Sequence, residues 1–112
     1  MSDHELVEAL KALAHPLRLR IMQVLSGRER NVGEIEDAAA ISQPTLSQQL
    51  AVLRNVGLVR TRKDAKLVYY RIDDDVLTNI VAATAELSKA STALAPPPRL
   101  PAAGVANFAR LG

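Results

Sequence analysis

The sequence predicts a mainly α-helical domain with one two-stranded β-hairpin, in which four helices precede the hairpin and a fifth follows it. Aromatic residues make up only 3% of the 112 residues, so the core has to consist of Leu, Ile, Val and Ala, which favours helices. Apolar residues recur at helical spacing through most of residues 2–54. From Leu58 to Ile72 the pattern changes to alternation with β-branched and aromatic residues, which is typical of strands.

The helices before the hairpin are delimited by capping residues and helix breakers. Ser2 or Asp3 can cap a first helix that extends to Ala14. A residue that precedes proline is disfavoured in helical conformation, so this helix ends before Pro16, which opens a second helix ending at Gly27. The remaining segments are a loop at 28–31, a short third helix at 32–40 and a fourth helix at 42–54.

The fourth predicted helix has two chemically different sides. At 100° per residue, Leu46, Leu50 and Leu53 lie on one narrow apolar stripe. The opposite side carries Gln, Ser and Thr, which both donate and accept hydrogen bonds and therefore suit base edges in the major groove of DNA. Taken alone, the segment fits an ordinary amphipathic surface helix as well as it fits a helix that binds DNA. The outward-facing candidates are Gln43, Thr45, Ser47 and Gln48.

The predicted hairpin consists of strands at 58–62 and 67–72, joined by residues 63–66. Residues 54–71 contain six basic side chains against one acid, Asp64, in a chain whose net charge is only +2. Such a local concentration of basic residues is typical of a surface that binds polyanions, and the alternative is a solvated loop. The candidate phosphate contacts are Arg60, Arg62, Lys63, Lys66 and Arg71.

A fifth helix is expected from Asp74 to Ser91, and the sequence then becomes rich in Pro and Ala. We therefore expect one domain at 1–93 and a flexible tail at 94–112. The first and fifth helices carry more apolar surface than a domain of this size can cover by itself, which predicts a homodimer. The candidate interface residues are Leu6, Val7, Leu10, Leu77, Ile80, Val81, Thr84 and Leu87.

The order of these elements indicates a DNA-binding fold. The helices at 32–40 and 42–54 have helix-turn-helix spacing, and a basic hairpin follows them. In this winged helix-turn-helix arrangement the second helix of the pair enters the major groove and the hairpin, or wing, reaches over the phosphate backbone. The wing would supply affinity that falls steeply with salt, and the polar helix face would supply sequence preference.

Several motifs support a more specific interpretation. They are KALAHPLRLRI at 11–21, VGEI at 32–35, SQPTLSQQL at 42–50, GLV at 57–59 and the wing segments at 60–66 and 69–72. In combination they resemble the ArsR/SmtB family of bacterial repressors. The resemblance implies a homodimeric winged helix-turn-helix protein whose first and last helices form the dimer interface. It also implies binding to an imperfect inverted repeat in the protein's own promoter, with release when an inducer binds.

The sensory sites used by many members of this family are missing from the sequence. There is no cysteine, which excludes disulfides, thiolate metal sites and thiol redox sensing. At the metal site on the last helix Asp74 remains, but the other positions that need ligands hold Val76, Leu87 and Ala90.

Asp3 and His4 are the remaining candidates for a nickel, cobalt or zinc site. One His among exposed acids is usually an ordinary surface residue, so no metal or other cofactor is expected. The inducer is therefore not evident, and regulation through an unconventional metal site or a sensory partner protein stays an alternative.

Other classes of function find little support in the sequence. Two dispersed His, no Cys, no Gly-rich phosphate loop and no Ser-His-acid set argue against an enzyme. A winged helix used as a protein-interaction module is the main alternative, and the basic wing and uncharged polar helix face argue against it. Neither a signal peptide nor a membrane-spanning segment is recognisable. We expect a cytoplasmic homodimer that binds double-stranded operator DNA.

Overall fold

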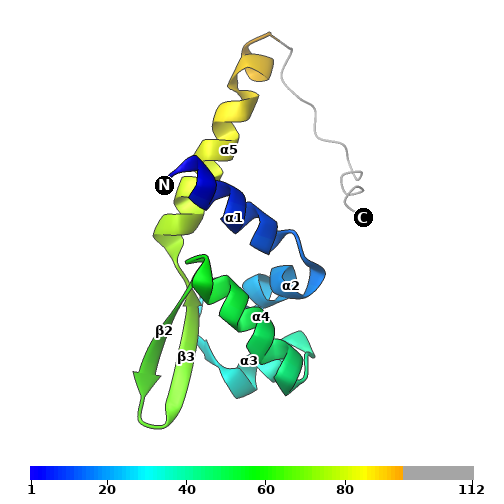
Figure 1. The fold of residues 1–112 in the computed structure, drawn as a ribbon, viewed down its shortest axis with the longest axis vertical. Helices are drawn as coiled ribbons and strands as arrows, with labels where there is room; N and C mark the ends of the chain where they lie inside the picture. Colours follow the sequence, from blue (N-terminus) through cyan, green and yellow to red (C-terminus); the bar gives the residue numbers. More distant parts are fainter. Residues whose placement is uncertain (95–112) are drawn as a thin grey trace. The chain divides into compact units, whose positions relative to one another are not determined.

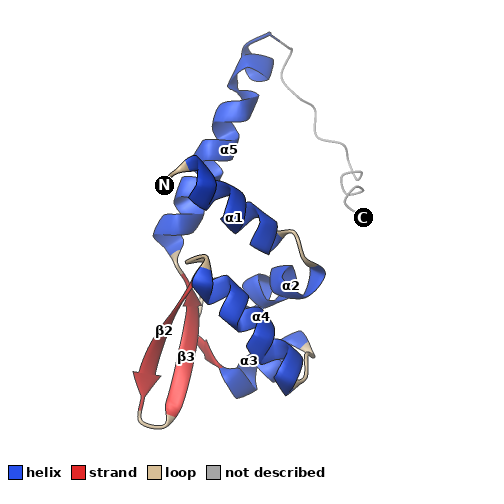
Figure 2. Ribbon diagram, viewed as in Figure 1, coloured by secondary structure: helices blue, strands red, loops and turns tan. Residues whose placement is uncertain are grey.

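The computed structural model describes residues 1–94, and its side chains are described through Lys89. Figure 1 shows the order of the elements, and Figure 2 shows that the strands of the described residues form one small sheet among helices. The elements are α1 (Asp3–Leu13), α2 (Pro16–Leu25), β1 (Arg30–Asn31), α3 (Val32–Ala39), α4 (Gln43–Asn55), β2 (Val59–Asp64), β3 (Leu67–Ile72) and α5 (Asp74–Leu94). The predicted class, five helices with a winged hairpin between the fourth and the fifth, is confirmed.

The chain divides into two compact units, Met1–Ala82 and Ala83–Gly112, and the boundary between them lies within α5. The first unit contains the helix-turn-helix and the wing. The predicted tail at 94–112 lies outside the described residues, apart from Leu94 at the end of α5. The predicted domain boundary after residue 93 therefore stays a prediction.

Reciprocal hydrogen bonds between a side chain and the backbone begin two of the helices. Ser2 Oγ accepts the backbone N–H of Glu5 at 3.1 Å, and Glu5 Oε1 accepts that of Ser2 at 2.8 Å. The hydrogen bond from the Ser2 backbone N–H stabilises the carboxylate and, with a smaller contribution from the Ser2 side chain, holds the pKa of Glu5 below its ordinary value. Asn31 and Glu34 make the same arrangement at the start of α3, with both bonds at 2.9 Å. These caps fix where α1 and α3 begin.

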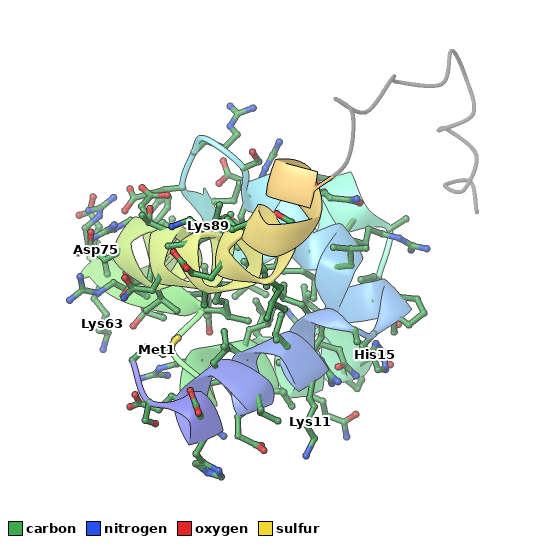
Figure 3. All side chains as sticks on the ribbon, turned by 90° about the horizontal axis from the view of Figure 1, so that it is seen from above. Met1, Lys11, His15, Lys63, Asp75 and Lys89 are labelled. Carbon is green, nitrogen blue, oxygen red and sulfur yellow. The ribbon has the colours of Figure 1, made fainter. Side chains whose placement is uncertain are left out.

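The junction between α1 and α2 is formed by His15 and Pro16, and Figure 3 shows His15 at this bend. His15 Nδ1 accepts the backbone N–H of Leu17 at 3.2 Å. Pro16 occupies the first turn, where its missing N–H leaves no hydrogen bond unmade. His15 is therefore the N-cap of α2, and the prediction that a second helix opens at Pro16 is confirmed.

Three arginines hold the C-terminal ends of helices. Their guanidinium groups donate to carbonyl oxygens that have no partner within the helix and place positive charge at the negative end of the helix dipole. The three bonds are Arg18 Nε to Ala12 O at 2.8 Å, Arg20 Nη1 to Ala39 O at 3.1 Å and Arg30 Nε to Val24 O at 2.8 Å.

Aliphatic side chains from the helices and from the start of β2 form one core, and no polar or charged side chain is buried among the described residues. Full burial of one Leu or Ile side chain contributes about 1.5–3 kcal/mol. The helix-turn-helix is thus held to α2 mainly by apolar contacts. The largest fully buried side chains are Ile21, Leu25, Ile35, Leu46, Leu50, Leu53 and Leu58.

The sheet has three strands in the order β1-β3-β2, both pairs antiparallel. The prediction of a plain loop at 28–31 was wrong for its second half, since Arg30 and Asn31 pair with Tyr70 and Tyr69. A two-residue strand shows no alternation, so the sequence offers no signal for it. The wing connection is also shorter than predicted, because β2 extends to Asp64 and β3 begins at Leu67.

The connection from α4 to the wing depends on Gly57. Its φ of 82° lies in the left-handed region, which costs glycine little. Its N–H donates to Arg54 O at 3.0 Å, and the N–H of Leu58 donates to Leu53 O at 3.0 Å. These two bonds end α4 in a Schellman motif and direct the chain into β2.

Candidate nucleic-acid interface

The inner and outer sides of α4 lie as the sequence predicts. Leu46, Leu50 and Leu53 are 0%, 2% and 0% exposed and anchor the helix in the core. Three of the four outward-facing candidates are exposed, and the fourth, Thr45, is half-buried. The face therefore presents uncharged polar groups on a helix whose position is set by fully buried leucines. The three exposed candidates are Gln43, Ser47 and Gln48.

Two of these candidates are linked to each other. Ser47 Oγ donates to Gln43 Oε1 at 2.9 Å, one helical turn away. The hydrogen bond orients the Gln43 amide so that its NH2 group is left for another partner. It also reduces the number of conformations that both side chains would lose on binding DNA.

The turn before α4 completes the helix-turn-helix. The helix α3 ends at Ala39 and is followed by its C-cap, Ala40, whose φ of 56° is in the left-handed region. Its N–H donates to Glu36 O at 2.9 Å. Ile41 is 5% exposed and anchors the turn in the core. α3 is fixed through Ile35 and Ala39, so the angle between α3 and α4 is set by buried contacts on both sides of the turn.

The five basic candidates of the wing do not form one patch. In antiparallel pairing, residues opposite each other share a face, and successive residues alternate between faces. Arg60 pairs with Arg71, and Arg62 pairs with Tyr69, so the three arginines lie on one face of the hairpin. Lys63 pairs with Val68 on the other face, and Figure 3 shows Lys63 on the hairpin. Lys66 lies in the two-residue turn.

Arg62 is bound within the protein. Its Nη2 and Nε donate to the two carboxylate oxygens of Glu29 at 2.8 and 3.1 Å, and Nη1 lies 3.7 Å from Asp64. The guanidinium also lies 4.8 Å from the centre of the Tyr69 ring. The hydrogen bonds to Arg62 lower the pKa of Glu29, and the same pairing raises the pKa of Arg62. Sequence analysis did not identify Glu29 as part of the wing.

The other wing cations differ in how far their charge is compensated. Arg60 Nε lies 3.8 Å from Asp73, a contact at the edge of ion-pair range. Lys63, Lys66 and Arg71 make no ion pair with any described residue. The last three side chains are exposed. Lys63 and Lys66 have the most uncompensated charge to offer to phosphates, whereas Arg71 also interacts electrostatically with Glu29.

Gln49 and Arg18 are residues of the candidate interface that sequence analysis did not single out. Gln49 lies between the buried stripe and the outer face of α4, and it is half-buried. Arg18 Nη1, from α2, donates to Gln49 Oε1 at 2.9 Å. A helical wheel marks Gln49 as a boundary position, but it contains no signal for its partner.

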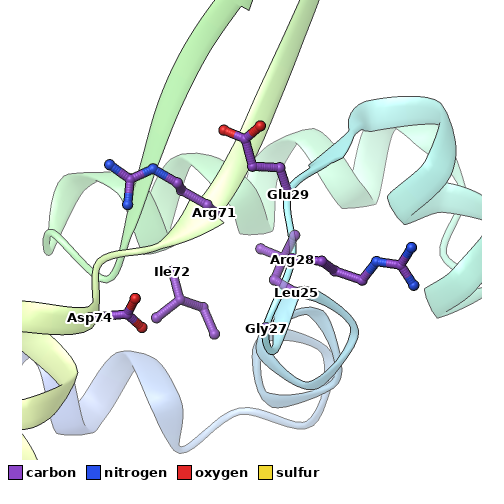
Figure 4. A pocket seen from close by; sticks show the side chains of 7 residues that line it. All are labelled: Leu25, Gly27, Arg28, Glu29, Arg71, Ile72 and Asp74. Atoms are coloured by element: carbon purple, nitrogen blue, oxygen red, sulfur yellow. The ribbon is translucent and has the colours of Figure 1, made fainter.

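A cavity of about 260 Å³ lies beside the wing (Figure 4). Its lining includes Arg28, Glu29, Arg71 and Asp74. In Figure 4 the guanidinium groups of Arg28 and Arg71 point in opposite directions, so they do not converge on a common ligand position.

The residues predicted at a dimer interface differ in how far they are buried within a single chain. Val7, Leu10 and Val81 are large apolar side chains that are 49%, 38% and 60% exposed. Ile80 is only 5% exposed and packs in the core of its own chain, and its assignment to the interface stays a prediction. Leu6 and Leu77 are half-buried, and Thr84 and Leu87 are exposed residues of the second unit.

The two candidate metal ligands lie at the start of α1. Asp3 is its first residue, and His4 borders a shallow cleft together with Glu5 and Glu8. Within the described part of the chain, no three His, Asp or Glu side chains are grouped so that they could hold a metal ion. None of the described helices is long and apolar enough to cross a membrane.

A helix-turn-helix on a rigid core, followed by a basic hairpin, defines a winged helix-turn-helix DNA-binding protein. Residues 15–61 match the family model described as "Bacterial regulatory protein, arsR family". Over 79 residues the chain is 47% identical to the biofilm growth-associated repressor of Agrobacterium fabrum, covering 70% of this chain and 68% of that protein. The chain belongs to the ArsR family and is a DNA-binding transcriptional regulator, not an enzyme.

Solved structures and other relatives agree with this assignment. The crystal structure of the transcriptional repressor BigR from Xylella fastidiosa superposes with a TM-score of 0.61 and 42% identity, over 70% of this chain and 82% of that one. The transcriptional activator HlyU of Vibrio cholerae is 47% identical over 66 residues, which are 59% of this chain and 61% of that protein. Relatives of similar identity are therefore named both as repressors and as activators.

Proposed function

We propose that the protein is a dimeric repressor that binds an inverted-repeat operator, with α4 in the major groove and the wing over the phosphate backbone. The observation that carries the proposal is the exposed, uncharged polar face of α4 on three fully buried leucines. A rigid helix with neutral donors and acceptors suits the reading of base edges, which require defined geometry more than charge. Repression as the outcome is supported by the resemblance to the repressor of Agrobacterium fabrum.

In this proposal the two parts of the interface have different tasks. Gln43, Thr45, Ser47 and Gln48 contact base edges or neighbouring phosphate oxygens. The wing cations supply sequence-independent affinity, mainly through Lys63, Lys66 and Arg71, while Arg60 and Arg62 must first loosen their contacts with carboxylates.

The dimer is proposed from the apolar surface of α1 and the start of α5. Val7, Leu10 and Val81 would be removed from water against the same residues of a second copy. A two-fold dimer would place two α4 helices about one DNA turn apart, which matches an inverted repeat. Light scattering should give twice the chain mass, and a monomer at micromolar concentration would contradict this part of the proposal.

DNA binding is tested by a gel shift with the upstream region of the protein's own gene across a salt series. We expect preference for this DNA over a scrambled sequence and a steep loss of affinity with salt. The same region fused to a reporter should be expressed less when the protein is present. Equal binding to both DNA sequences at every salt concentration would contradict the proposed reading role of α4.

In this proposal the signal that releases the DNA reaches the chain either through a sensory partner protein or through an unconventional metal site. The chain has no cysteine, so oxidation of its own thiols cannot be the signal. Calorimetry with nickel, cobalt and zinc tests the competing assignment to Asp3 and His4. Binding of one metal per chain with loss of the gel shift would decide for the metal site in this proposal.

A further inference from the structure

The side chain of Gln49 is held by a residue of another helix. Arg18 Nη1 donates to Gln49 Oε1 at 2.9 Å, while Arg18 Nε donates to Ala12 O at 2.8 Å. The bond to the last turn of α1 fixes the guanidinium, so its second bond comes from a group with little freedom to move. Both partners are half-buried, which strengthens a charge-assisted hydrogen bond relative to an exposed one.

This bond determines which end of the Gln49 amide faces Arg18. A guanidinium has donors and no acceptor, so only the amide oxygen can lie against it. The amide is planar, and fixing its oxygen turns the NH2 group away from Arg18. A free glutamine can rotate and pair with either a donor or an acceptor, whereas Gln49 held by Arg18 offers its partner only donors.

Gln49 lies where this restriction matters for DNA. It directly follows Gln48 and lies one turn after Thr45, at the edge of the polar face of α4. We propose that Arg18 is a positioning residue that holds the Gln49 amide with its NH2 group toward the DNA. Gln49 thereby discriminates against cytosine, whose major-groove edge has only a donor, and in favour of guanine, thymine or adenine, whose edges have an acceptor. This inference rests on the proposed role of α4 as the reading helix.

The test measures base preference rather than affinity alone. The full-length protein and its variants select from a DNA pool in which one operator half-site is randomised. At one position of the half-site, the unchanged protein should disfavour cytosine by about tenfold relative to the bases that have an acceptor there. In Arg18→Met this preference should fall below about threefold, because the amide can then rotate, while preferences at the other positions persist. A role of Arg18 in the fold alone would weaken all sequences equally.

Two further variants separate orientation from stability. Arg18→Lys should retain the preference, since lysine also has only donors. Gln49→Glu keeps an oxygen for Arg18 but replaces the outward NH2 group by an acceptor, so cytosine, which offers an exocyclic amine, should change from disfavoured to favoured, and guanine and thymine should become disfavoured. If Arg18→Met does not give a folded circular dichroism spectrum, Gln49→Glu decides the question.

Several results would overturn the inference. One is a folded Arg18→Met protein with the original preference at every position. Another is uniform weakening with a flatter salt dependence, which would show that Arg18 contacts a phosphate. An unchanged base preference in Gln49→Glu would also contradict the inference.

Gln48→Ala provides the matched control. If this variant alters base preference while the Arg18 and Gln49 variants do not, α4 reads DNA and only this inference fails. If none of them alters preference, the reading role of α4 fails as well.

Discussion

The helix α4 and the β2–β3 wing both face the proposed DNA site, but they are built in opposite ways. α4 is neutral on its outer face and rests on leucines that are at most 2% exposed. The wing is charged, and near its turn it has exposed apolar residues such as Leu67, which is 47% exposed. Rigid support suits neutral groups that must meet base edges in one geometry, whereas a cation can neutralise a phosphate from many positions.

The wing also differs from α4 in how its polar groups are used before DNA binds. Arg62 is already paired with Glu29 and stacked near Tyr69, while Lys66 makes no ion pair with a described residue. The number of basic residues in the wing therefore overstates the positive charge that is left to bind DNA phosphates. The contrast leads to five predictions. They begin with the leucines that support α4 and end with the ion pair that compensates charge on the wing.

The largest effect is expected for Leu50→Ala. Removing this fully buried side chain should lower the free energy of unfolding by about 2–5 kcal/mol, as in other large-to-small core substitutions. The control Leu67→Ala removes the same atoms from the exposed wing and should change stability by less than about 1 kcal/mol. Urea unfolding measures both, and similar losses would contradict the difference in support between α4 and the wing.

Gln48→Ala should weaken binding to the operator by about 1–3 kcal/mol, because it removes a base contact. Binding to scrambled DNA and the midpoint of urea unfolding should stay unchanged, since Gln48 is exposed. Gln23→Ala, at an exposed position of α2, is the matched control. Unfolding of the Gln48 variant would show that the outer face of α4 is wrongly assigned.

Lys66→Ala should weaken operator and scrambled DNA alike and lower the salt slope of binding by about 1. Arg62→Ala should have a smaller effect on affinity, because binding of Arg62 to phosphate would require loss of its pairing with Glu29. Gel shifts over a salt series measure both slopes. A larger slope change for Arg62 than for Lys66 would show that the ion pair does not compensate the arginine.

Glu29→Gln should strengthen binding to all DNA sequences slightly and make the salt slope steeper by up to about 1, because Arg62 then keeps only its longer contact with Asp64. Glu8→Gln, which disrupts the exposed pair with Lys11 on α1, is the control and should leave DNA binding unchanged. Weaker binding by Glu29→Gln would indicate that Glu29 serves to orient Arg62 rather than to offset its charge.

The same pair has a defined pH dependence. The pKa of Glu29 is lower in the folded chain than in the unfolded chain, so its stabilising contribution is complete above the unfolded pKa. The contribution is lost as the pH falls through the lowered folded pKa. The pair is therefore intact at neutral pH, which an NMR titration of the Glu29 carboxyl carbon would test.

The positions of the helices and the two sides of α4 followed from local pattern. Buried leucines recur at the period of a helix, and caps such as Ser2 act on residues three positions away, so both kinds of signal are contained in short windows of sequence. The short strand β1 could not be found in this way, because Arg30 and Asn31 are strand residues only through their pairing with β3.

The sequence by itself determined the fold class, the buried stripe of α4 and the kind of protein to which the chain belongs. Tertiary structure decided which polar side chains are paired within the protein and which are left to bind DNA. Glu29 and Arg62 are 33 positions apart and Arg18 and Gln49 are 31 apart, yet their atoms are within hydrogen-bond distance. Hydrogen bonds and ion pairs depend on separations of a few ångströms, which are set by how the helices and the hairpin pack and which no local period encodes.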